Sequence, residues 1–314
     1  MNLLVTGSTG LVGRALCVHL RDLGWAVRGV SRQASDPVGQ QSVVQIRSID
    51  EDTDWRGALR GIDVVLHLAA RVHIMQDRSA DPLAEFRRVN VHGTLNLARQ
   101  AASAGVRRLV FVSSVKVHGE ATVSGRPFTE LDPLLPQDAY GQSKLEAEQG
   151  LQMIAMQTGL ELVIVRPPLV YGPGVKANFA ALMRAVQQGW PLPLGAVQNL
   201  RSLVALDNLV DFLSLCASHP RAAQQSFLIS DGQDVSTPQL LREMAHALGR
   251  PARLLPLPVP VLRALGRLSG QSAAIDRLCG NLQLDISKAR TLLGWTPVLG
   301  LSEGLRKACH NCYA

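Results

Sequence analysis

A tyrosine and a lysine four positions apart, Tyr140 and Lys144 in DAYGQSK, could carry acid–base chemistry. The residues that follow, SKLEAEQGLQMIAMQTG, predict a helix that ends at a glycine, so the two side chains should share one helix face. A phenol with a pKa of about 10 exchanges protons easily near neutrality only if that pKa falls by roughly three units, and a nearby ammonium acts in this direction. Such a pair is also common on ordinary helix surfaces, so its meaning depends on the rest of the chain.

A glycine-rich stretch near the N-terminus predicts a nucleotide site. The apolar run LLVT (3–6) leads directly into TGSTGLVGRAL, in which three glycines are evenly spaced. Gly7 and Gly10 allow a tight turn and the close approach of a pyrophosphate, and Gly13 lets the next helix meet the strand. The N-terminus of that helix adds free N–H groups and the positive end of its dipole. At the first strand-to-helix turn of a βαβ unit, this pattern indicates dinucleotide binding.

The end of the second apolar run bears on which dinucleotide binds. NAD-binding chains usually carry an acid there for the ribose 2′-hydroxyl, whereas this chain has Ser31 and Arg32 and no acid before Asp36. A guanidinium can hold a 2′-phosphate through two parallel hydrogen bonds. The sequence therefore favours NADP(H), with Arg32 and also Arg28 or Arg14 as phosphate ligands. NAD(H), with a solvated arginine, stays open as the alternative.

These residues must be positioned by a parallel sheet. Short apolar and β-branched runs alternate with helical stretches up to residue 166, and several runs lack polar alternation, as strands covered on both faces do. The fold class is predicted to be α/β, a Rossmann-like doubly wound parallel sheet that binds ligands at the carboxyl ends of its strands. The predicted strands are LLVT (3–6), WAVRGV (25–30), VVQI (43–46), DVVLHLA (63–69), RLVFVSS (108–114) and LELVIVR (160–166).

The second half differs in composition from the first. After RPPLVYGPG (166–174) the sequence predicts proline- and glycine-rich loops and short helices. It predicts a smaller C-terminal α/β substrate-binding domain. The boundaries are 1–166, with roughly 203–229 returning to it, for the dinucleotide-binding domain, and 167–202 with 230–314 for the substrate domain.

Three segments of this half carry local predictions. Ser236 or Thr237 should cap a helix in PQLLREMAHALG, with Pro238 in its first turn, and Ser302 should cap a helix in LSEGLRKACHN. The stretch RLLPLPVPVLRALGRLSG (253–270) could bind a membrane surface or a partner. Its three prolines and its arginines favour a proline-stiffened connection into a short core helix instead.

Composition narrows the class of protein. With 46% hydrophobic and 18% charged residues the chain is typical of a soluble globular protein, and no apolar run reaches the ~18 residues of a membrane span or fits a secretory signal. Five cysteines suit reduced thiols in the cytoplasm, and the Cys309–Cys312 pair lacks a partner pair, so no metal site is predicted. A net charge of +7 suits an anionic ligand or a membrane surface, while scattered arginines and 4% aromatic residues argue against nucleic acid.

Motifs along nearly the whole chain add a resemblance to a known family. In order, they are TGSTGLVG, HLAA (67–70), VNVHGTLNL with Asn90, SSVKVHG (113–119), YGQSK (140–144) and RPPLVYGPG. Together they resemble the extended short-chain dehydrogenase/reductase family and, more narrowly, its nucleotide-sugar epimerase/dehydratase branch.

The resemblance implies roles for Tyr140 and Lys144. Tyr140 would be the acid/base, Lys144 would lower its pKa and hold the nicotinamide ribose, and a serine after the fifth strand would bind the substrate oxygen. Matching SSVKVHG to the family's SS-x-x-VYG selects Ser114 rather than Ser113. His118 stands where the family usually has tyrosine, and we expect it to pack rather than to act in catalysis.

The same loop distinguishes between reactions. Sugar 4,6-dehydratases of this branch carry Thr-Asp-Glu, whereas this chain reads Ser114, Val115, Lys116, so dehydration is not expected. The reactions that remain open are those that transfer a hydride at the sugar 4-position.

The family's ligand contacts carry over to matching positions. Ser48 replaces the usual aspartate before Ile49, so the adenine edge should rest mainly on the Ile49 backbone. The cofactor contacts implied are Gly7, Thr9, Gly10, Leu11, Val12, Gly13, Ser31, Arg32, Ser48, Ile49, Leu68, Ala69, Ala70, Asn90, Tyr140, Lys144 and Pro167. The substrate contacts implied are Ser114, Lys116, Tyr140, Asn178, Leu192, Leu194, Arg201 and Asp285.

Three functional hypotheses follow. The first is an NADP(H)-dependent reductase of the C4 keto group of a UDP-linked 4-keto-6-deoxy-N-acetylhexosamine in surface-polysaccharide (O-antigen) synthesis, because LPLGAVQNLRSLV and AIDRLCGNLQLD look like those enzymes. The alternative is an NAD-dependent UDP-sugar 4-epimerase. A non-catalytic dinucleotide-binding sensor is the third, and the intact Ser114, Tyr140, Lys144 set argues against it. The family's habit also implies a homodimer, formed through two helices that include the Tyr140 helix.

Overall fold

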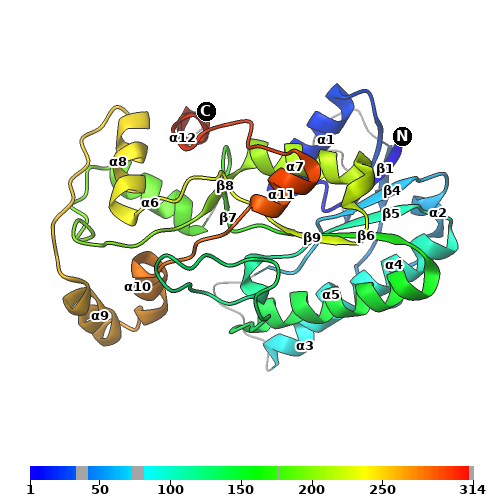
Figure 1. Ribbon diagram of the computed structural model, residues 1–314, viewed down its shortest axis with the longest axis horizontal. Coiled ribbons are helices and arrows are strands. Elements are labelled where there is room, and N and C mark those ends of the chain that lie inside the picture. Colours follow the sequence, from blue (N-terminus) through cyan, green and yellow to red (C-terminus); the bar gives the residue numbers. More distant parts are fainter. Residues whose placement is uncertain (33–41, 73–80, 176, 311–314) are drawn as a thin grey trace.

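The protein is built on a seven-stranded parallel sheet with helices on both faces (Figure 1). The computed structural model describes residues 1–32, 42–72, 81–175 and 177–310. The strand order is β3-β2-β1-β4-β5-β6-β9, so the chain reverses direction across the sheet between β1 and β4. The six predicted strands are present and the fold class is confirmed. The strands are β1 (Asn2–Thr6), β2 (Ala26–Ser31), β3 (Ser42–Gln45), β4 (Val64–His67), β5 (Arg108–Val112), β6 (Glu161–Arg166) and β9 (Gln225–Leu228).

Alternation along the strands builds two cores, one on each face of the sheet. In β1, Leu3 and Val5 join one cluster and Leu4 joins the other. The first cluster is covered by α1 (Leu11–Asp22), α7 (Leu206–Ser218) and α11 (Ser287–Leu293). The second is covered by α2 (Arg56–Leu59), α4 (Thr94–Ser103) and α5 (Ala139–Thr158).

The C-terminal half forms a third cluster at the other end of the long axis (Figure 1). It contains a two-stranded parallel sheet and several helices, while α7 and β9 belong to the large sheet and its cover. The division into two domains stays a prediction. The elements of this half are β7 (Leu169–Tyr171), β8 (Leu203–Ala205), α6 (Ala177–Gln187), α8 (Thr237–Ala247), α9 (Val259–Leu268), α10 (Ser272–Cys279) and α12 (Leu301–His310).

The two helix-cap predictions have different outcomes. The Ser236 hydroxyl accepts a hydrogen bond from the Gln239 N–H at the start of α8, as predicted. The prediction for Ser302 is wrong. α12 already begins at Leu301, which is buried, so Ser302 lies inside the first turn and its hydroxyl donates to Glu243.

The helix in the proline-rich stretch is not a core helix, so that prediction is also wrong. Only Leu262 and Gly266 of α9 are buried. A Cβ at Gly266 would lie 2.8 Å from the Ile275 side chain, which shows that α9 uses one narrow face to pack on α10.

Three observations bear on the cysteines, on metals and on membrane spans. Cys216 and Cys279 are free thiols, Cys17 and Cys309 are buried, and Cys312 lies outside the described residues. In the part of the chain that the structure describes, no group of three or more His, Cys, Asp or Glu side chains could hold a metal ion. Among those same residues, no helix has the length and apolar character needed to cross a bilayer.

A buried ion pair fixes α5 to the sheet. Arg166, at the end of β6, meets Glu148 of α5 with two hydrogen bonds of 3.1 and 2.6 Å. His118 lies 3.0 Å from the same guanidinium, and its ring stacks on Phe128, so it packs as expected. Burial and the Arg166 charge lower the pKa of His118 to about 4, which keeps the ring neutral at physiological pH. Glu148 lies two turns beyond Tyr140, so this pair also sets the position of the candidate catalytic helix.

We expect Glu148→Gln to lower the free energy of unfolding by about 3–5 kcal/mol, because it leaves the Arg166 charge buried without its partner. Urea denaturation measures this. The matched control is Asp54→Asn, which breaks an exposed pair with Arg56 and should leave the free energy of unfolding nearly unchanged. Equal effects of the two substitutions would contradict the structural role of the buried pair.

Candidate functional site

The glycines after β1 form a turn with no room for side chains. Gly7 has a φ of +70°, and a Cβ there would lie 2.9 Å from the Ala69 nitrogen. At Gly13 a Cβ would lie 2.1 Å from the Gly7 carbonyl oxygen. At Gly10 it would meet only that oxygen, at 3.2 Å, and Gly10 is exposed. The turn is therefore closed toward the sheet and open at the N-terminus of α1, which is the geometry that a pyrophosphate needs.

This turn forms one wall of a cleft of about 730 Å³ at the reversal point between β1 and β4. Its volume is in the range of cofactor sites. Four of the predicted cofactor residues, Asn90, Tyr140, Lys144 and Pro167, do not line it. The predicted residues that do line it are Gly7, Thr9, Gly10, Leu11, Val12, Gly13, Ser31, Arg32, Ser48, Ile49, Leu68, Ala69 and Ala70.

The three arginines predicted as phosphate ligands are placed differently. Arg32 is exposed and lines the cleft. Arg28 instead donates to backbone carbonyls of residues 58 and 60, and Arg14 donates to the Thr9 carbonyl, so neither lines the cleft. In the described part of the chain, no Asp or Glu lines the cleft. Asp36 is not among the described residues.

A six-residue π-helix (Arg88–Gly93) supports the opposite wall. A Cβ at Gly93 would lie 2.8 Å from the Ile49 carbonyl, so the glycine allows the helix to touch the predicted adenine-binding backbone. Asn90 in this segment is buried and hydrogen-bonds both the N–H and the C=O of Arg71, as well as the Ser143 hydroxyl. It thereby joins the loop after β4 to α5. Its direct contact with a cofactor stays a prediction.

The Tyr140–Lys144 pair lies at the start of α5, one turn apart, as the sequence predicts. Asp138 caps this helix, and its carboxylate accepts a 2.6 Å hydrogen bond from the Gly141 N–H. The Lys144 ammonium is buried and lies 4.0 Å from the centroid of the Phe111 ring in β5.

The electrostatics of this pair differ from expectation. Burial and the Asp138 charge raise the pKa of Tyr140 to about 12, where the sequence led us to expect a lowered value. Burial lowers the pKa of Lys144 to about 7. Both shifts have one cause, because a poorly solvated site disfavours whichever form of a group is charged. The protein alone therefore does not make Tyr140 acidic.

Ser114 is positioned by a short loop tied to the same helix. Its hydroxyl accepts a 3.2 Å hydrogen bond from the Lys116 N–H. Ser114 thereby caps the 3₁₀ turn η2 (Val115–Val117). The Lys116 ammonium pairs with both Asp138 and Glu120. Although burial opposes it, these two carboxylates raise the pKa of Lys116. Because Asp138 also caps α5, the Lys116 pairing brings the Ser114 loop to the end of the helix that bears Tyr140.

Two arginines, Arg201 and Arg277, lie close together in the C-terminal half. The Arg201 guanidinium donates to the carbonyls of Arg277 and Gly280, and burial, with the nearby Arg277 charge, lowers its pKa. The Arg277 Nε is buried and has no hydrogen-bond partner among the described residues. Two adjacent guanidiniums suit an anion. Arg277 is not among the site residues predicted from the sequence. The only sequence feature that could have pointed to it is that it is the arginine in AIDRLCGNLQLD.

The remaining predicted substrate residues are dispersed. Leu192 pairs by its backbone with residues 253–255, and Leu194 is buried in the third cluster. Asp285 accepts a hydrogen bond from the N–H two residues later. Asn178 lies in α6, and its side chain is outside the described part. Their substrate contacts stay predictions.

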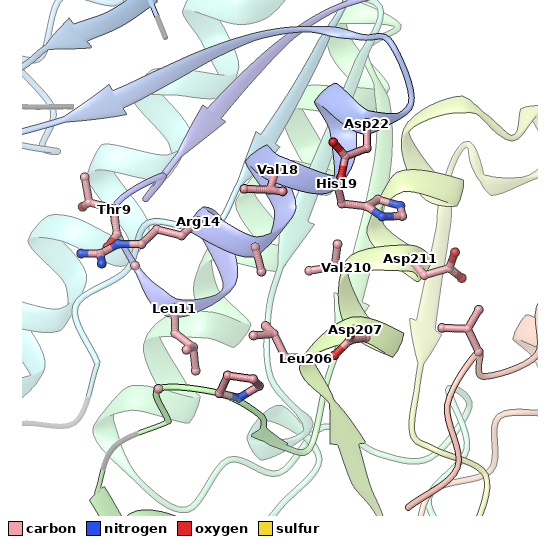
Figure 2. Close-up of a pocket in the computed structure, with 15 residues that line it drawn as sticks. Thr9, Leu11, Arg14, Val18, His19, Asp22, Leu206, Asp207, Val210 and Asp211 are labelled. Carbon is pink, nitrogen blue, oxygen red and sulfur yellow. The ribbon is translucent and has the colours of Figure 1, made fainter. Parts of the chain in front are cut away.

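A larger cavity, of about 990 Å³, lies on the other side of α1, between α1 and α7 (Figure 2). It shares residues 9–11 with the cleft but contains none of the predicted catalytic or substrate residues. Two of its carboxylates are engaged in packing, since Asp207 pairs with Lys307 and Asp211 accepts from the Trp295 indole. Size alone therefore does not mark the functional site in this molecule.

The chain is similar to known proteins over nearly its whole length. Residues 3–230 match the NAD dependent epimerase/dehydratase family. The chain is 47% identical over 308 residues to UDP-glucose 4-epimerase of Vibrio cholerae, covering 98% of this chain and 94% of the relative. It is 27% identical to N-acetyl-alpha-D-glucosaminyl-diphospho-ditrans,octacis-undecaprenol 4-epimerase of Escherichia coli O157:H7, over 97% and 93% of the two chains. Among solved structures, MoeE5 in complex with UDP-glucose and NAD is similar with a TM-score of 0.78 and 27% identity, over 100% and 99% of the two chains.

We expect Gly13→Ala to weaken dinucleotide binding by about tenfold or more and to destabilise the fold by about 1–3 kcal/mol, because an overlap with backbone cannot be relieved by a rotamer change. Fluorescence titration with NADH and thermal unfolding measure the two effects. Gly57→Ala is the matched control, since nothing lies within 4 Å of its added Cβ. Unchanged binding in Gly13→Ala would show that the turn does not hold the dinucleotide.

Proposed function

Because the chain belongs to the NAD-dependent epimerase/dehydratase family, within the extended short-chain dehydrogenases/reductases, we propose that it interconverts the C4 epimers of a UDP-sugar with NAD as its cofactor. The observation that carries this proposal is 47% identity to a UDP-glucose 4-epimerase over nearly the whole of both chains. The epimerase, which the sequence analysis held as the alternative, therefore ranks ahead of the reductase of a 4-keto sugar.

In this proposal Tyr140 accepts the proton of the C4 hydroxyl and later returns it, while Ser114 hydrogen-bonds the same oxygen and favours the carbonyl that forms. A nicotinamide bound beside C4 would supply a hydride acceptor and donor for the two half-reactions and, in its oxidised form, a positive charge. Protons and hydride balance over the cycle, so no external reductant is consumed.

Lys144 has the position of an electrostatic partner for Tyr140. With a pKa of about 7 it is partly protonated near neutrality, and a phenolate forming one turn away favours its charged form. The two groups thus ionise together. This coupling opposes burial and the Asp138 charge, which together raise the pKa of Tyr140 to about 12.

The C-terminal half would hold the rest of the substrate. The Arg201 and Arg277 pair is suited to the diphosphate, since two guanidiniums in a poorly solvated place gain from an anion between them. Lys116 would act mainly by positioning the Ser114 loop, because its ammonium is already paired with two carboxylates.

We keep acceptance of NADP(H) as a second proposal. Arg32 at the rim of the cleft supports it, as does the lack of an Asp or Glu among the described lining residues. We also expect the protein in the cytoplasm, where its free thiols would remain reduced. The homodimer stays a prediction.

Tyr140→Phe should lower the rate of UDP-galactose to UDP-glucose conversion by about 10²–10⁴, because the proton acceptor is lost. Ser114→Ala should lower it by about 10²–10³. Coupled detection of UDP-glucose measures both rates. The control is Ser113→Ala, which removes a buried hydroxyl that has no partner among the described residues and should leave the rate unchanged. Consumption of NADPH with a UDP-4-keto-6-deoxy sugar, without epimerisation of any UDP-sugar, would favour the reductase instead.

For the cofactor, we expect Arg32→Gln to weaken NADP⁺ binding by about tenfold or more while NAD⁺ binding changes by less than about twofold, since only the 2′-phosphate needs the guanidinium. Isothermal titration of both nucleotides measures this. Arg28→Gln is the matched control, because that side chain faces backbone carbonyls away from the cleft. If wild type and Arg32→Gln bind NADP⁺ equally, Arg32 has no part in cofactor choice.

A further inference from the structure

An apolar stripe faces outward on α9, the helix that the sequence placed in a core. Val261, Leu265 and Leu268 are spaced four and three positions apart, so they share one face of the helix. Their exposed fractions are 43%, 51% and 87%, and Leu255 in the preceding segment is 52% exposed. The other apolar face of α9, with Leu262, packs inward.

The charge around this stripe has one sign. Between Glu243 and Asp276 the chain contains four arginines, at 250, 253, 263 and 267, and no acidic residue. All four are exposed. Arg263 pairs with Asp276, which leaves the other three charges outside that pair. An outward apolar stripe, with arginines on the other faces of the same helix and in the segment before it, suits a partner that has an apolar interior and a negatively charged surface.

The neighbouring segment adds an aromatic residue. Trp190 is 59% exposed and lies two residues before Leu192, whose backbone pairs with residues 253–255. The segment and α9 occupy the end of the molecule away from the large sheet (Figure 1). Exposed tryptophan and leucine side chains beside arginines are the composition of helices that lie in a membrane interface.

We propose that the surface formed by Trp190, Arg253, Leu255, Val261, Leu265, Arg267 and Leu268, the α9 surface, docks the protein on anionic lipid. The geometry favours lipid over a protein partner. The apolar part is one helical stripe and a few adjacent side chains, whereas a stable protein interface uses about 20–30 residues on each side. A headgroup layer accepts shallow leucines and gains from each arginine near it.

Flotation of the purified full-length protein with phosphatidylglycerol-containing vesicles, compared with pure phosphatidylcholine vesicles, tests this proposal. We expect binding to the anionic vesicles only, and weaker binding at high salt. Leu265→Glu/Leu268→Glu should abolish it, and Arg253→Gln/Arg267→Gln should weaken it by about 25-fold, at about fivefold for each arginine. These side chains are exposed, so thermal unfolding should be unchanged.

Leu131→Glu is the matched control, because Leu131 is 97% exposed and lies outside the α9 surface. It should bind vesicles as the wild type does. Equal binding to neutral and anionic vesicles, no binding at all, or undiminished binding of Leu265→Glu/Leu268→Glu would overturn the proposal. Self-association in sedimentation velocity that this double variant removes, without vesicle binding, would assign the surface to a protein contact instead. Epimerisation of a soluble UDP-sugar is measured separately, so failure of one proposal is distinguishable from failure of the other.

Discussion

The cleft depends on two backbone segments that approach more closely than any side chain would allow. Gly7 lies against the backbone at Ala69, and Gly13 lies against the Gly7 carbonyl, so the loops after β1 and β4 touch where the sheet reverses. This contact places the N-terminus of α1 at the carboxyl ends of the strands, and a cleft of about 730 Å³ follows from it. A methyl group at either glycine would separate the parts that must converge on one dinucleotide.

The proposed catalytic residues are held by a second set of contacts, centred on α5. Asp138 caps the helix and pairs with Lys116, Asn90 ties Ser143 to the loop after β4, and Glu148 anchors the helix through Arg166. Ion pairs and a buried amide thus fix the positions of the proposed catalytic side chains, whereas the glycines shape the cleft. The same contacts place Tyr140 and Lys144 in a poorly solvated site, which disfavours the charged form of each.

The cleft and the groove between α1 and α7 illustrate why chemistry, rather than volume, identifies the proposed site. The groove between α1 and α7 is larger, but two of its carboxylates are already engaged by Lys307 and Trp295 (Figure 2). The smaller cleft has the glycine turn and several exposed arginines, Arg32 among them, and it is lined by most of the cofactor residues that the family resemblance implies. At the far end of the molecule, the α9 surface is a separate feature with its own chemistry, since apolar side chains and one sign of charge meet there.

Much of this could be read in the sequence, because local pattern determines local structure. Apolar runs gave the strand positions, and the Tyr140 to Lys144 spacing gave one face of one helix. Tertiary structure decided what depends on residues far apart in the chain. Burial raises the pKa of Tyr140, and Arg277 becomes a candidate ligand only beside Arg201. The outward face of α9 likewise depends on how little of that helix the rest of the chain covers, and no local pattern contains that information.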